Sequence, residues 1–511
     1  MANSVDVDEY CHLRVSIFSE DRKKSNKLKQ QLMANGIKEV LVHAQQSVLL
    51  NNETSLTYDI LFLFSSNQLN VVELIDELVF RERLSVSTRI VFISSDKKVT
   101  DSIYEQVFFI HKVVDDPPQV SAINQQLSEH LLIKKNFKLP FNSIDQCQFK
   151  EAFIATKDMV IKEQPKLIKN FTNKTLIFLL LELGQYTTAS KMLKPLCEKD
   201  ILWAQWAMFT VHYELANIRE CELFLNDRNI KKLTPRKVFH WSIYLAMKKN
   251  KYSLAKKMIV QIPSQNMSLS MFRLSVTVLT LAGDFDLAYN FISRKLSTVF
   301  SSDPIYQTLS LAISRAALLE IIQNKQPQTQ LLLKRSAKSL EKLKSNSQNM
   351  LSSFDYVYLK YATTLLLNED DADLDKLQKI NHDLLEQSHD PVEMICACYV
   401  NHIAKNEEIV FELLYRVNCS IFRLRHSCRG IVISLMHQTA FDLIYPKSTQ
   451  PIIYKRLAER HLQDNNYKLA AKMFLAAFKG SSKDHQYLIS MKECLNKAEI
   501  KAYRGISLNG N

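Results

Sequence analysis

Glycine is scarce in this chain, with seven in 511 residues where average usage would give about 36. No two glycines lie close together before residue 505. Phosphate-binding loops of the Walker and dinucleotide-binding kinds need several glycines within a few residues, because the backbone must approach the phosphates closely. Both loops are therefore excluded, and with them nucleotide hydrolysis by a P-loop. So little glycine, with only 12 prolines, favours a largely helical chain.

Cysteines at metal-ligand or disulfide spacing are also missing. Nine cysteines are scattered between Cys11 and Cys494, and the closest pair, Cys396 and Cys398, is separated by one residue. This pattern is neither a disulfide framework nor a zinc site. The first residues are acidic rather than basic, and no apolar run approaches the roughly 20 residues that span a bilayer. We therefore predict a reducing, cytoplasmic location and no membrane insertion.

Catalytic motifs are absent as well. The 13 histidines are scattered, and neither H-E-x-x-H nor G-x-S-x-G occurs. His382 and His389 follow a run of acids at residues 369–371, but their seven-residue separation is interpreted as a helical coincidence rather than a metal site. We predict no catalytic residues, no metal and no cofactor, so the chain is expected not to be an enzyme.

Charge is divided unevenly along the chain. Residues 1–133 carry 13 Lys and Arg against 18 Asp and Glu, a net charge of −5. The remaining residues carry 53 against 35, a net charge of +18. An acidic head and a basic body indicate different partners for the two parts, or attraction between them. Binding of nucleic acid by the body is the less favoured alternative, because no recognised nucleic-acid motif occurs.

The head alternates short apolar segments with helical stretches. The predicted strands are residues 13–19, 39–44, 59–64, 89–94 and 109–114, and the predicted helices are residues 25–36, 70–80 and 118–132. Apolar strands separated by helices indicate a parallel sheet covered on both faces. Five strands in this length predict the flavodoxin-like, doubly wound fold.

Residues 11–133 resemble the receiver domain of bacterial response regulators. The phrase YDILFLF (58–64) resembles the third strand of a receiver, RIVFISS (89–95) the fourth, and DPPQVSAINQQL (116–127) the last turn and helix. The resemblance implies an acidic pair after the first strand for Mg²⁺ and a phosphoacceptor aspartate ending the third. It also implies a Ser or Thr ending the fourth strand and a Lys ending the fifth.

The chain departs from this pattern where the chemistry takes place. Glu20 with Asp21 is one match to the acidic pair, although the tightest alignment places Ser19 and Glu20 there, and Ser94 matches the hydroxyl position. The phosphoacceptor position falls on Phe64, and the lysine position falls on Asp116. Phenylalanine can neither accept a phosphoryl group nor bind Mg²⁺. We therefore predict a pseudo-receiver, kept for contact and without phosphorylation chemistry.

A different flavodoxin-like domain is the alternative for the head. Such a domain would bind a flavin or another small ligand at the strand ends. The pairs Ser65–Ser66 and Ser94–Ser95 follow two strands and could hydrogen-bond an anion, although serine is also an ordinary turn residue.

The body repeats a short phrase at a spacing near 34 residues. A small residue is followed by an aromatic or aliphatic one, then a small one, then an apolar one. The positions are Gly184, Tyr186, Ala189 and Leu193; Ala216, Ile218, Cys221 and Leu225; Asn250, Tyr252, Ala255 and Ile259; Gly283, Phe285, Ala288 and Ile292; and Tyr467, Ala470 and Phe474. Stacked helix–turn–helix units have this periodicity.

The phrase resembles the tetratricopeptide repeat. Gly or Asn would end the first helix of each unit, the aromatic would pack over the turn, and the small residue would let the two helices approach. The resemblance implies a concave groove lined by the first helices, with an aromatic floor and a cationic edge suited to an acidic or extended peptide. Carried over by position, the groove would include Lys174, Trp206, Tyr213, Lys237, His240, Tyr244, Lys248 and Arg273.

The predicted organisation follows from these segments. It comprises a degenerate receiver-like domain (11–133), a helical connector (134–165), tetratricopeptide-like repeats (166–295), degenerate helical repeats (296–450) and a last repeat with a capping helix (451–500). This layout is similar to the receiver–tetratricopeptide auxiliary proteins of two-component systems, of the VieB type. The expected function is a non-catalytic adaptor that binds a sensor kinase, a phosphotransfer domain or a response regulator. A nucleic-acid-associated regulator and a response regulator with displaced phosphorylation chemistry remain alternatives.

Overall fold

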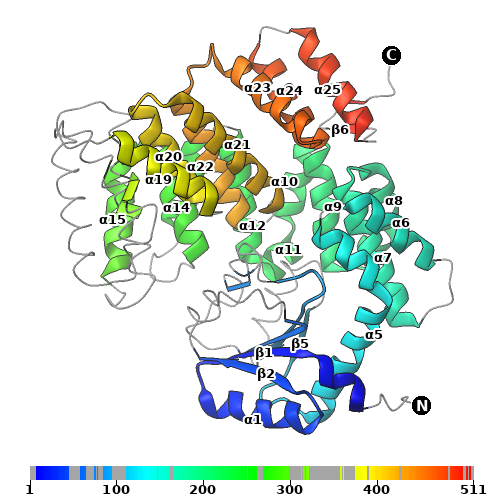
Figure 1. Cartoon of the computed structure of the whole chain (residues 1–511). Coiled ribbons are helices and arrows are strands. Elements are labelled where there is room, and N and C mark those ends of the chain that lie inside the picture. The colour runs from blue at the N-terminus through cyan, green and yellow to red at the C-terminus, as the bar shows by residue number, and fades with distance from the viewer. Residues whose placement is uncertain are drawn as a thin grey trace. The chain divides into compact units, whose positions relative to one another are not determined.

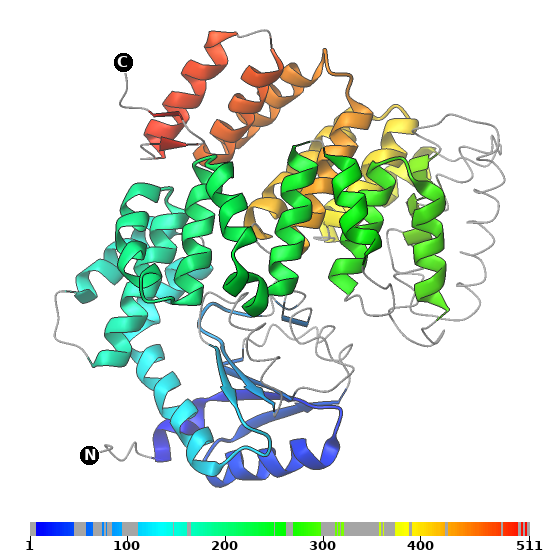
Figure 2. The ribbon, with the colours of Figure 1, turned by 180° about the vertical axis from the view of Figure 1, so that it is seen from behind.

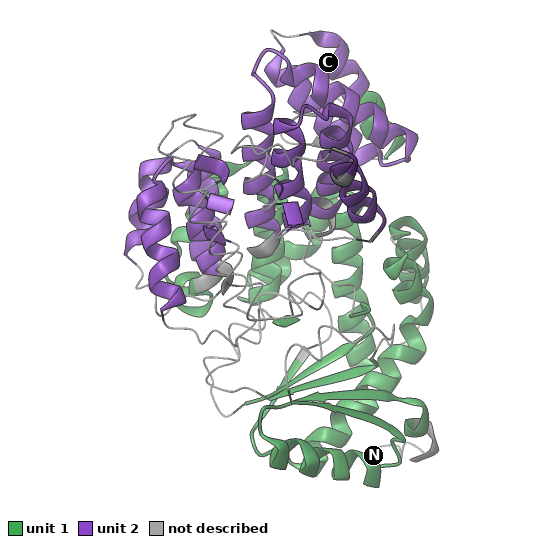
Figure 3. Cartoon of the chain, turned by 60° about the vertical axis from the view of Figure 1, so that its left-hand side comes forward, with its two compact units in different colours: residues 1–238, 492–511 green, residues 239–491 purple. Residues whose placement is uncertain are grey.

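A computed structural model gives the structure of the chain. It describes residues 7–44, 58–64, 74–75, 78, 84–94, 111–146, 148–160, 165–249, 251–261, 269–297, 312–313, 315–316, 318–320, 357–358, 361, 374–387, 391–424, 428–481, 484–498, 502–503 and 506–507. The chain divides into two compact units (Figure 3): unit 1 is Met1–Val238 with Lys492–Asn511, and unit 2 is Phe239–Met491.

Unit 1 begins with a five-stranded parallel sheet (Figure 1). Its strands are β1 (Arg14–Phe18), β2 (Glu39–His43), β3 (Ile60–Phe64), β4 (Arg89–Ile93) and β5 (His111–Val114). They lie in the order β2-β1-β3-β4-β5, which is the order of flavodoxin-like, doubly wound folds. The predicted parallel sheet is therefore confirmed, with each strand within two residues of its predicted start.

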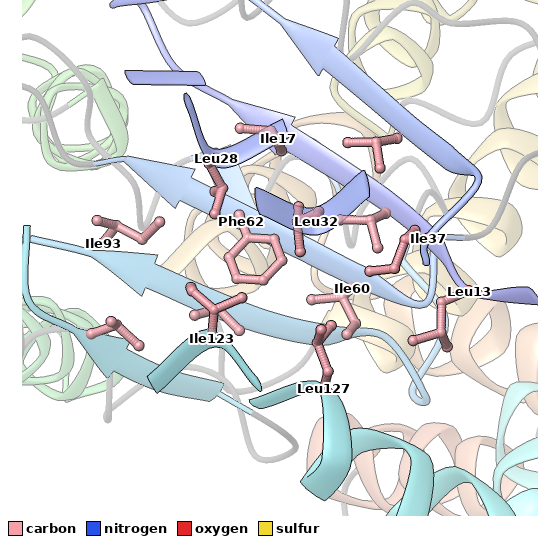
Figure 4. Packing of buried hydrophobic residues seen from close by; sticks show 14 of the residues in the cluster. Leu13, Ile17, Leu28, Leu32, Ile37, Ile60, Phe62, Ile93, Ile123 and Leu127 are labelled. Carbon is pink, nitrogen blue, oxygen red and sulfur yellow. The ribbon is translucent and has the colours of Figure 1, made fainter. Parts of the chain in front are cut away.

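Apolar side chains cover the two faces of this sheet alternately, because successive residues of a strand point to opposite sides. On one face Ile60, Phe62 and Phe64 pack with α1 (Arg22–Ala34) and α5 (Val120–Asp145) in a single core (Figure 4). On the other face, Leu61 and Leu63 pack with Leu74, Ile75 and Leu78. Helical residues therefore lie on both faces, as the continuous apolar strands predicted.

Helix α5 belongs to two cores. Its first half buries Ile123 and Leu127 against the sheet. Its second half buries Phe137 and Phe141 among the helices that follow, where the Phe137 ring lies edge-on at 4.7 Å from that of Phe171. One helix therefore runs continuously past the expected domain boundary at residue 133.

The helical part continues through both units, and Figure 2 shows it from behind. In unit 1 the helices are α6 (Phe149–Val160), α7 (Lys166–Glu182), α8 (Tyr186–Cys197), α9 (Leu202–Glu214), α10 (Ile218–Asn226) and α11 (Arg228–Leu233). Helix α12 (Pro235–Lys248) leads into unit 2, whose helices are α13 (Tyr252–Val260), α14 (Leu269–Leu281), α15 (Phe285–Leu296), α19 (Leu374–Gln387), α20 (Pro391–Ile403), α21 (Glu407–Leu424), α22 (Cys428–Ile444), α23 (Gln450–Gln463) and α24 (Tyr467–Gly480).

Shorter elements and one further helix complete the description. A 3₁₀ helix, η1 (Val7–His12), precedes the sheet. Helix α25 (His485–Lys497) leads back to unit 1, where β6 (Ala502–Tyr503) and β7 (Ile506–Ser507) pair antiparallel. Among the helices described, none is both long enough and apolar enough to cross a bilayer.

The helix pairs of the body are joined by one recurring turn. A residue with positive φ follows the first helix, and the next N–H donates to the carbonyl five residues earlier, which is the Schellman motif. The donors and acceptors are Gln185 to Leu180, Asn217 to His212, Lys251 to Ala246, Asp284 to Leu279, Asn406 to Asn401 and Asn466 to His461, at 2.8–2.9 Å. The left-handed residues described in these turns are Gly184, Ala216, Gly283, Lys405 and Asn465.

A small or β-branched residue five positions after the turn is fully buried in every pair. These residues are Ala189, Cys221, Ala255, Ala288, Val410 and Ala470, each at 0% exposure. The repeat phrase had marked all of these positions except Val410. The aromatic position is less regular, since Tyr186 and Phe285 are buried but Tyr252 is 41% exposed.

Candidate functional site

The carboxyl ends of the parallel strands gather the receiver-position residues at one edge of the sheet. Glu20 lies exposed in the loop after β1, and Asp116 lies two residues after β5. Ser94 directly follows β4, is 4% exposed and donates its N–H to the carbonyl of Val114 at 3.0 Å. Asp21 begins the next helix. The described loops thus bring Glu20, Asp21, Ser94 and Asp116 to the edge where β3 ends in Phe64.

Phe64 is a core residue. It is the last residue of β3, is 5% exposed and pairs in register with Ile93 of β4. Its ring packs in the same cluster as Ile93 and Val114. The position that the receiver resemblance gives to the phosphoacceptor is therefore filled by a buried hydrocarbon ring with no oxygen for a phosphoryl group.

Asp21 is the N-cap residue of α1. Its Oδ1 accepts from the N–H of Lys23 at 2.9 Å and from that of Lys24 at 3.3 Å. Ser19 fixes the approach to the helix, because its Oγ accepts from the N–H of Asp21 at 3.2 Å. These bonds satisfy N–H groups that the first turn of a helix leaves without partners. The carboxylate that would be half of a magnesium pair is therefore used as a helix cap.

Lys24 and Asp116 join the two sides of this edge. The Lys24 ammonium donates to Asp116 Oδ2 at 2.5 Å, with side chains 46% and 16% exposed respectively. The hydrogen bond that Lys24 donates to Asp116 raises the pKa of Lys24. A receiver has carboxylates after β1 and a lysine after β5. Here Glu20 and Asp21 follow β1 as in a receiver, whereas Asp116 stands at the lysine position.

The described residues at this edge do not fit a magnesium ion; the pairs Ser65–Ser66 and Ser94–Ser95 lie outside them except for Ser94. Phe64 has no ligand atom, Asp21 caps α1 and Asp116 is paired with Lys24. Among the residues that the structure describes, no group of three or more His, Cys, Asp or Glu side chains is placed to hold a metal. No chemistry through Mg²⁺ follows from this arrangement.

A second candidate site lies on helices α7, α9 and α12. The Lys174 ammonium, on α7, lies 5.3 Å from the centre of the Trp203 ring on α9. The Lys237 ammonium, in the first turn of α12, lies 4.3 Å from the centre of the Trp206 ring, also on α9. Trp203 and Trp206 are three residues apart and so share a face of α9. We name these four residues the lysine–tryptophan ladder.

Trp206 of the lysine–tryptophan ladder is buried and held by neighbouring aromatic rings. Trp206 is 5% exposed and packs edge-on against Phe209 and Phe224, at 5.2 and 5.0 Å between ring centres. Its indole N–H has no acceptor among the described residues. Burial also lowers the pKa of Lys174 to about 8. Two cations over indoles, one of them poorly solvated, make a surface that favours negative charge.

The other groove residues lie in different surroundings. Tyr213 is partly exposed on α9 of unit 1. In unit 2, His240 and Tyr244 are buried at 2% and 6% exposure, Lys248 is exposed 5.5 Å from the Tyr244 ring, and Arg273 is partly exposed on α14. Of the predicted groove residues, the structure thus gathers Lys174, Trp206 and Lys237 around α9.

Trp203 was missing from the predicted groove. Its signal was present, since a tryptophan one helical turn before Trp206 shares its face. Comparison with known proteins adds no further residue, because no protein-family model, no curated protein and no solved structure matches the chain.

Proposed function

We propose that this chain is a non-catalytic adaptor in a bacterial two-component pathway, acting in the cytoplasm. A receiver-like domain without a phosphoacceptor docks on a sensor kinase, a phosphotransfer domain or a response regulator. A tetratricopeptide-like scaffold binds that protein or a second one. The observation that carries the proposal is Phe64, a buried ring that ends β3 where a receiver needs its aspartate.

Asp116 at the lysine position supports the loss of phosphorylation. A receiver lysine neutralises phosphoryl oxygens, whereas Asp116 at that position would repel them. Lys24 pairs with Asp116 at 2.5 Å, so this lysine is already engaged by a carboxylate. What remains of the receiver is its sheet and its covering helices, which is the part that serves contact.

The recurring turns support the tetratricopeptide-like scaffold. The same Schellman bond closes six helix pairs, and the residue five positions after the left-handed position is buried in each pair. In such scaffolds the first helices line the binding groove. The lysine–tryptophan ladder joins the first helices α7, α9 and α12, so we infer that it binds an acidic, extended peptide segment.

Phosphorylation is the decisive test of the receiver half. The purified full-length chain is incubated with Mg²⁺ and radiolabelled acetyl phosphate, beside an active receiver domain as positive control. We expect no acid-stable, base-labile label on the chain. Label on any aspartate would favour the alternative of displaced phosphorylation chemistry and would overturn the inactive receiver.

Binding of an acidic peptide tests the scaffold half. A glutamate-rich extended peptide is titrated into the full-length chain, and tryptophan fluorescence reports contact near Trp203 and Trp206. Lys237→Gln should weaken binding about tenfold, the loss of roughly one charge-assisted contact. Lys191→Gln on α8 changes a charge outside the ladder and is the matched control. Equal effects of the two substitutions would remove the ladder from the binding surface.

A further inference from the structure

Lys174 stands among aromatic residues on α7. Phe171 and Phe178 are one helical turn before and after it, at the spacing that places side chains on one face of a helix. Both phenylalanines pack against a core of unit 1. The Lys174 ammonium lies 5.3 Å from the centre of the Trp203 ring on α9, and α7 carries no carboxylate within one turn of it. The amine is therefore held next to an aromatic ring on an apolar stretch of helix.

Burial changes the chemistry of this amine. It lowers the pKa of Lys174 to about 8, because an ammonium that loses water loses stabilisation. The indole attracts the ammonium and opposes this fall, but it replaces only part of the lost hydration. At about pH 7.5, roughly one quarter of such amines are neutral, against about one in a thousand for a fully hydrated lysine. Only the neutral amine has the lone pair that attacks an electrophile.

A second cation lies near Lys174. Trp203 and Trp206 share one face of α9, and the Lys237 ammonium lies 4.3 Å from the centre of the Trp206 ring. The side chain of Lys174 is partly exposed, so a small molecule in solution reaches its amine. The lysine–tryptophan ladder thus combines a nucleophilic amine with a neighbouring positive charge that attracts small anions.

An acyl phosphate matches both lysines of the ladder. Its carbonyl carbon is an electrophile for Lys174, and its phosphate carries negative charge for Lys237. The lone pair of Lys174 Nζ attacks the carbonyl carbon, the C–O bond to the phosphate breaks, and phosphate leaves with the bonding electron pair. The attacking nitrogen then gives one proton to water. A neutral amide replaces the ammonium, and no oxidant or reductant takes part.

We propose that Lys174 is an acylation site that acyl phosphates modify without an enzyme. The amide carries no charge, so the lysine–tryptophan ladder loses one of its two cations and its affinity for an acidic peptide falls. This regulation rests on the proposed binding of an acidic peptide at the ladder, whereas the acylation itself does not.

A neutral acetyl donor measures the reactivity of Lys174 without any peptide ligand. The full-length chain is treated at about pH 7.5 with N-hydroxysuccinimidyl acetate, and mass spectrometry of chymotryptic peptides gives the acetylation rate at each lysine. Lys174 should react about tenfold faster than Lys191, which is exposed on α8. This gain is smaller than the difference in neutral fraction, because a less basic amine is a weaker nucleophile, as for thiols. Equal or slower acetylation of Lys174 would overturn the proposal.

An anionic donor tests the role of Lys237. With acetyl phosphate, Lys237→Gln should slow acetylation of Lys174 about threefold, since a unit charge is lost within a Debye length of a doubly charged anion. With the neutral donor, the same substitution should leave the rate unchanged. Lys191→Gln is the matched control and should change neither rate. No slowing by Lys237→Gln, or equal slowing with both donors, would overturn acyl phosphates as the modifying class.

The readouts separate this proposal from the function proposed above. Acetyl-lysine gains the mass of an acetyl group and resists base, whereas an aspartyl phosphate gains a phosphoryl group and is lost in base. Lys174→Gln resembles the neutral amide and should bind the glutamate-rich peptide about tenfold more weakly than the parent chain. Unchanged affinity would overturn the regulation. If the parent chain binds no acidic peptide, the ladder function fails together with its regulation, and the acetylation rates still decide the site.

Discussion

The Lys24 ammonium donates a hydrogen bond to Asp116 at 2.5 Å across the carboxyl-end edge of the sheet, and Asp116 stands where the receiver resemblance places a lysine. Lys24 is 46% exposed, so water screens the pair. We therefore expect a double-mutant cycle with Lys24→Ala and Asp116→Ala to give a coupling energy of about 0.5 kcal/mol. Hydrogen exchange of the β1 and β5 amides in the parent chain, the two single variants and the double variant measures this coupling energy. A coupling of several kcal/mol would mean that the pair is shielded from water and essential to the sheet.

An aspartate at Phe64, where the receiver resemblance places the phosphoacceptor, should not create phosphorylation chemistry. Phe64→Asp places a charge in a core position that is 5% exposed, and we expect it to cost about 3 kcal/mol or more of unfolding free energy. Phe64→Leu keeps the apolar contact and should cost about 1 kcal/mol. Urea unfolding followed by circular dichroism compares the two variants. A stable Phe64→Asp protein that takes label from acetyl phosphate would show that the remaining receiver machinery still works.

The sheet could be predicted because each strand is a nearly continuous apolar run. Ile60–Phe64 and Arg89–Ile93 have all five side chains buried, which is what residues 59–64 and 89–94 indicated. The Lys24–Asp116 pair was not predictable. The two residues are 92 positions apart, and only the strand order brings their loops to one edge.

The turn between α20 and α21 lies in the region predicted as degenerate helical repeats (296–450), and it lacks the repeat phrase. The turn after α20 has Lys405 in the left-handed position, Glu407 where an aromatic was expected and Val410 where alanine was expected. None of these residues carries the repeat phrase, yet the Schellman bond from Asn406 to Asn401 is present at 2.8 Å. The backbone geometry of these turns thus recurs even where their side chains differ. A sequence pattern detects only the side chains.

A substitution in the turn after α20 should stabilise unit 2. Lys405 has a φ of 60°, a conformation that costs an L-residue with a side chain about 1 kcal/mol relative to glycine. We expect Lys405→Gly to raise the unfolding free energy of unit 2 by up to about 1 kcal/mol. The converse substitution, Gly283→Ala at a φ of +72°, should lower it by a similar amount, since no neighbour lies within 4 Å of the added Cβ and only backbone strain acts. Thermal melts of the two variants should shift in opposite directions, and shifts of the same sign would contradict the shared role of these positions.

The affinity of the lysine–tryptophan ladder for an acidic peptide should fall as the pH becomes alkaline. Burial lowers the pKa of Lys174 to about 8, so its charge is present below that pH and lost as the pH rises through it. Affinity for an acidic peptide should therefore fall between pH 7 and pH 9. Lys174→Arg keeps its charge over that range and should remove the dependence, whereas Lys191→Arg on α8 should not. Fluorescence titrations of the parent chain and of both variants measure how peptide affinity changes with pH. If Lys174→Arg shows the same change as the parent chain, another group causes the dependence.

Acid should destabilise unit 1 through His130 of α5. The ring is 1% exposed, neither ring nitrogen has a hydrogen-bond partner among the described residues, and burial lowers its pKa to about 3. Asp59 opposes this shift, while Arg89 and Lys134 add to it. In the unfolded chain a histidine has a pKa of about 6.5, so that state binds the proton first and gains stability as the pH falls.

The contribution of His130 is therefore complete above about pH 6.5 and declines by up to about 1.4 kcal/mol per pH unit toward pH 3. His130→Leu should flatten this acid slope. Some slope should remain, because burial also lowers the pKa of His43 in the same unit. His12→Leu, at an exposed position of η1, is the matched control and should leave the slope unchanged. Urea unfolding between pH 4 and pH 7 measures each slope, and a slope in His130→Leu equal to that of the parent chain would show that protonation of this ring does not limit stability in acid.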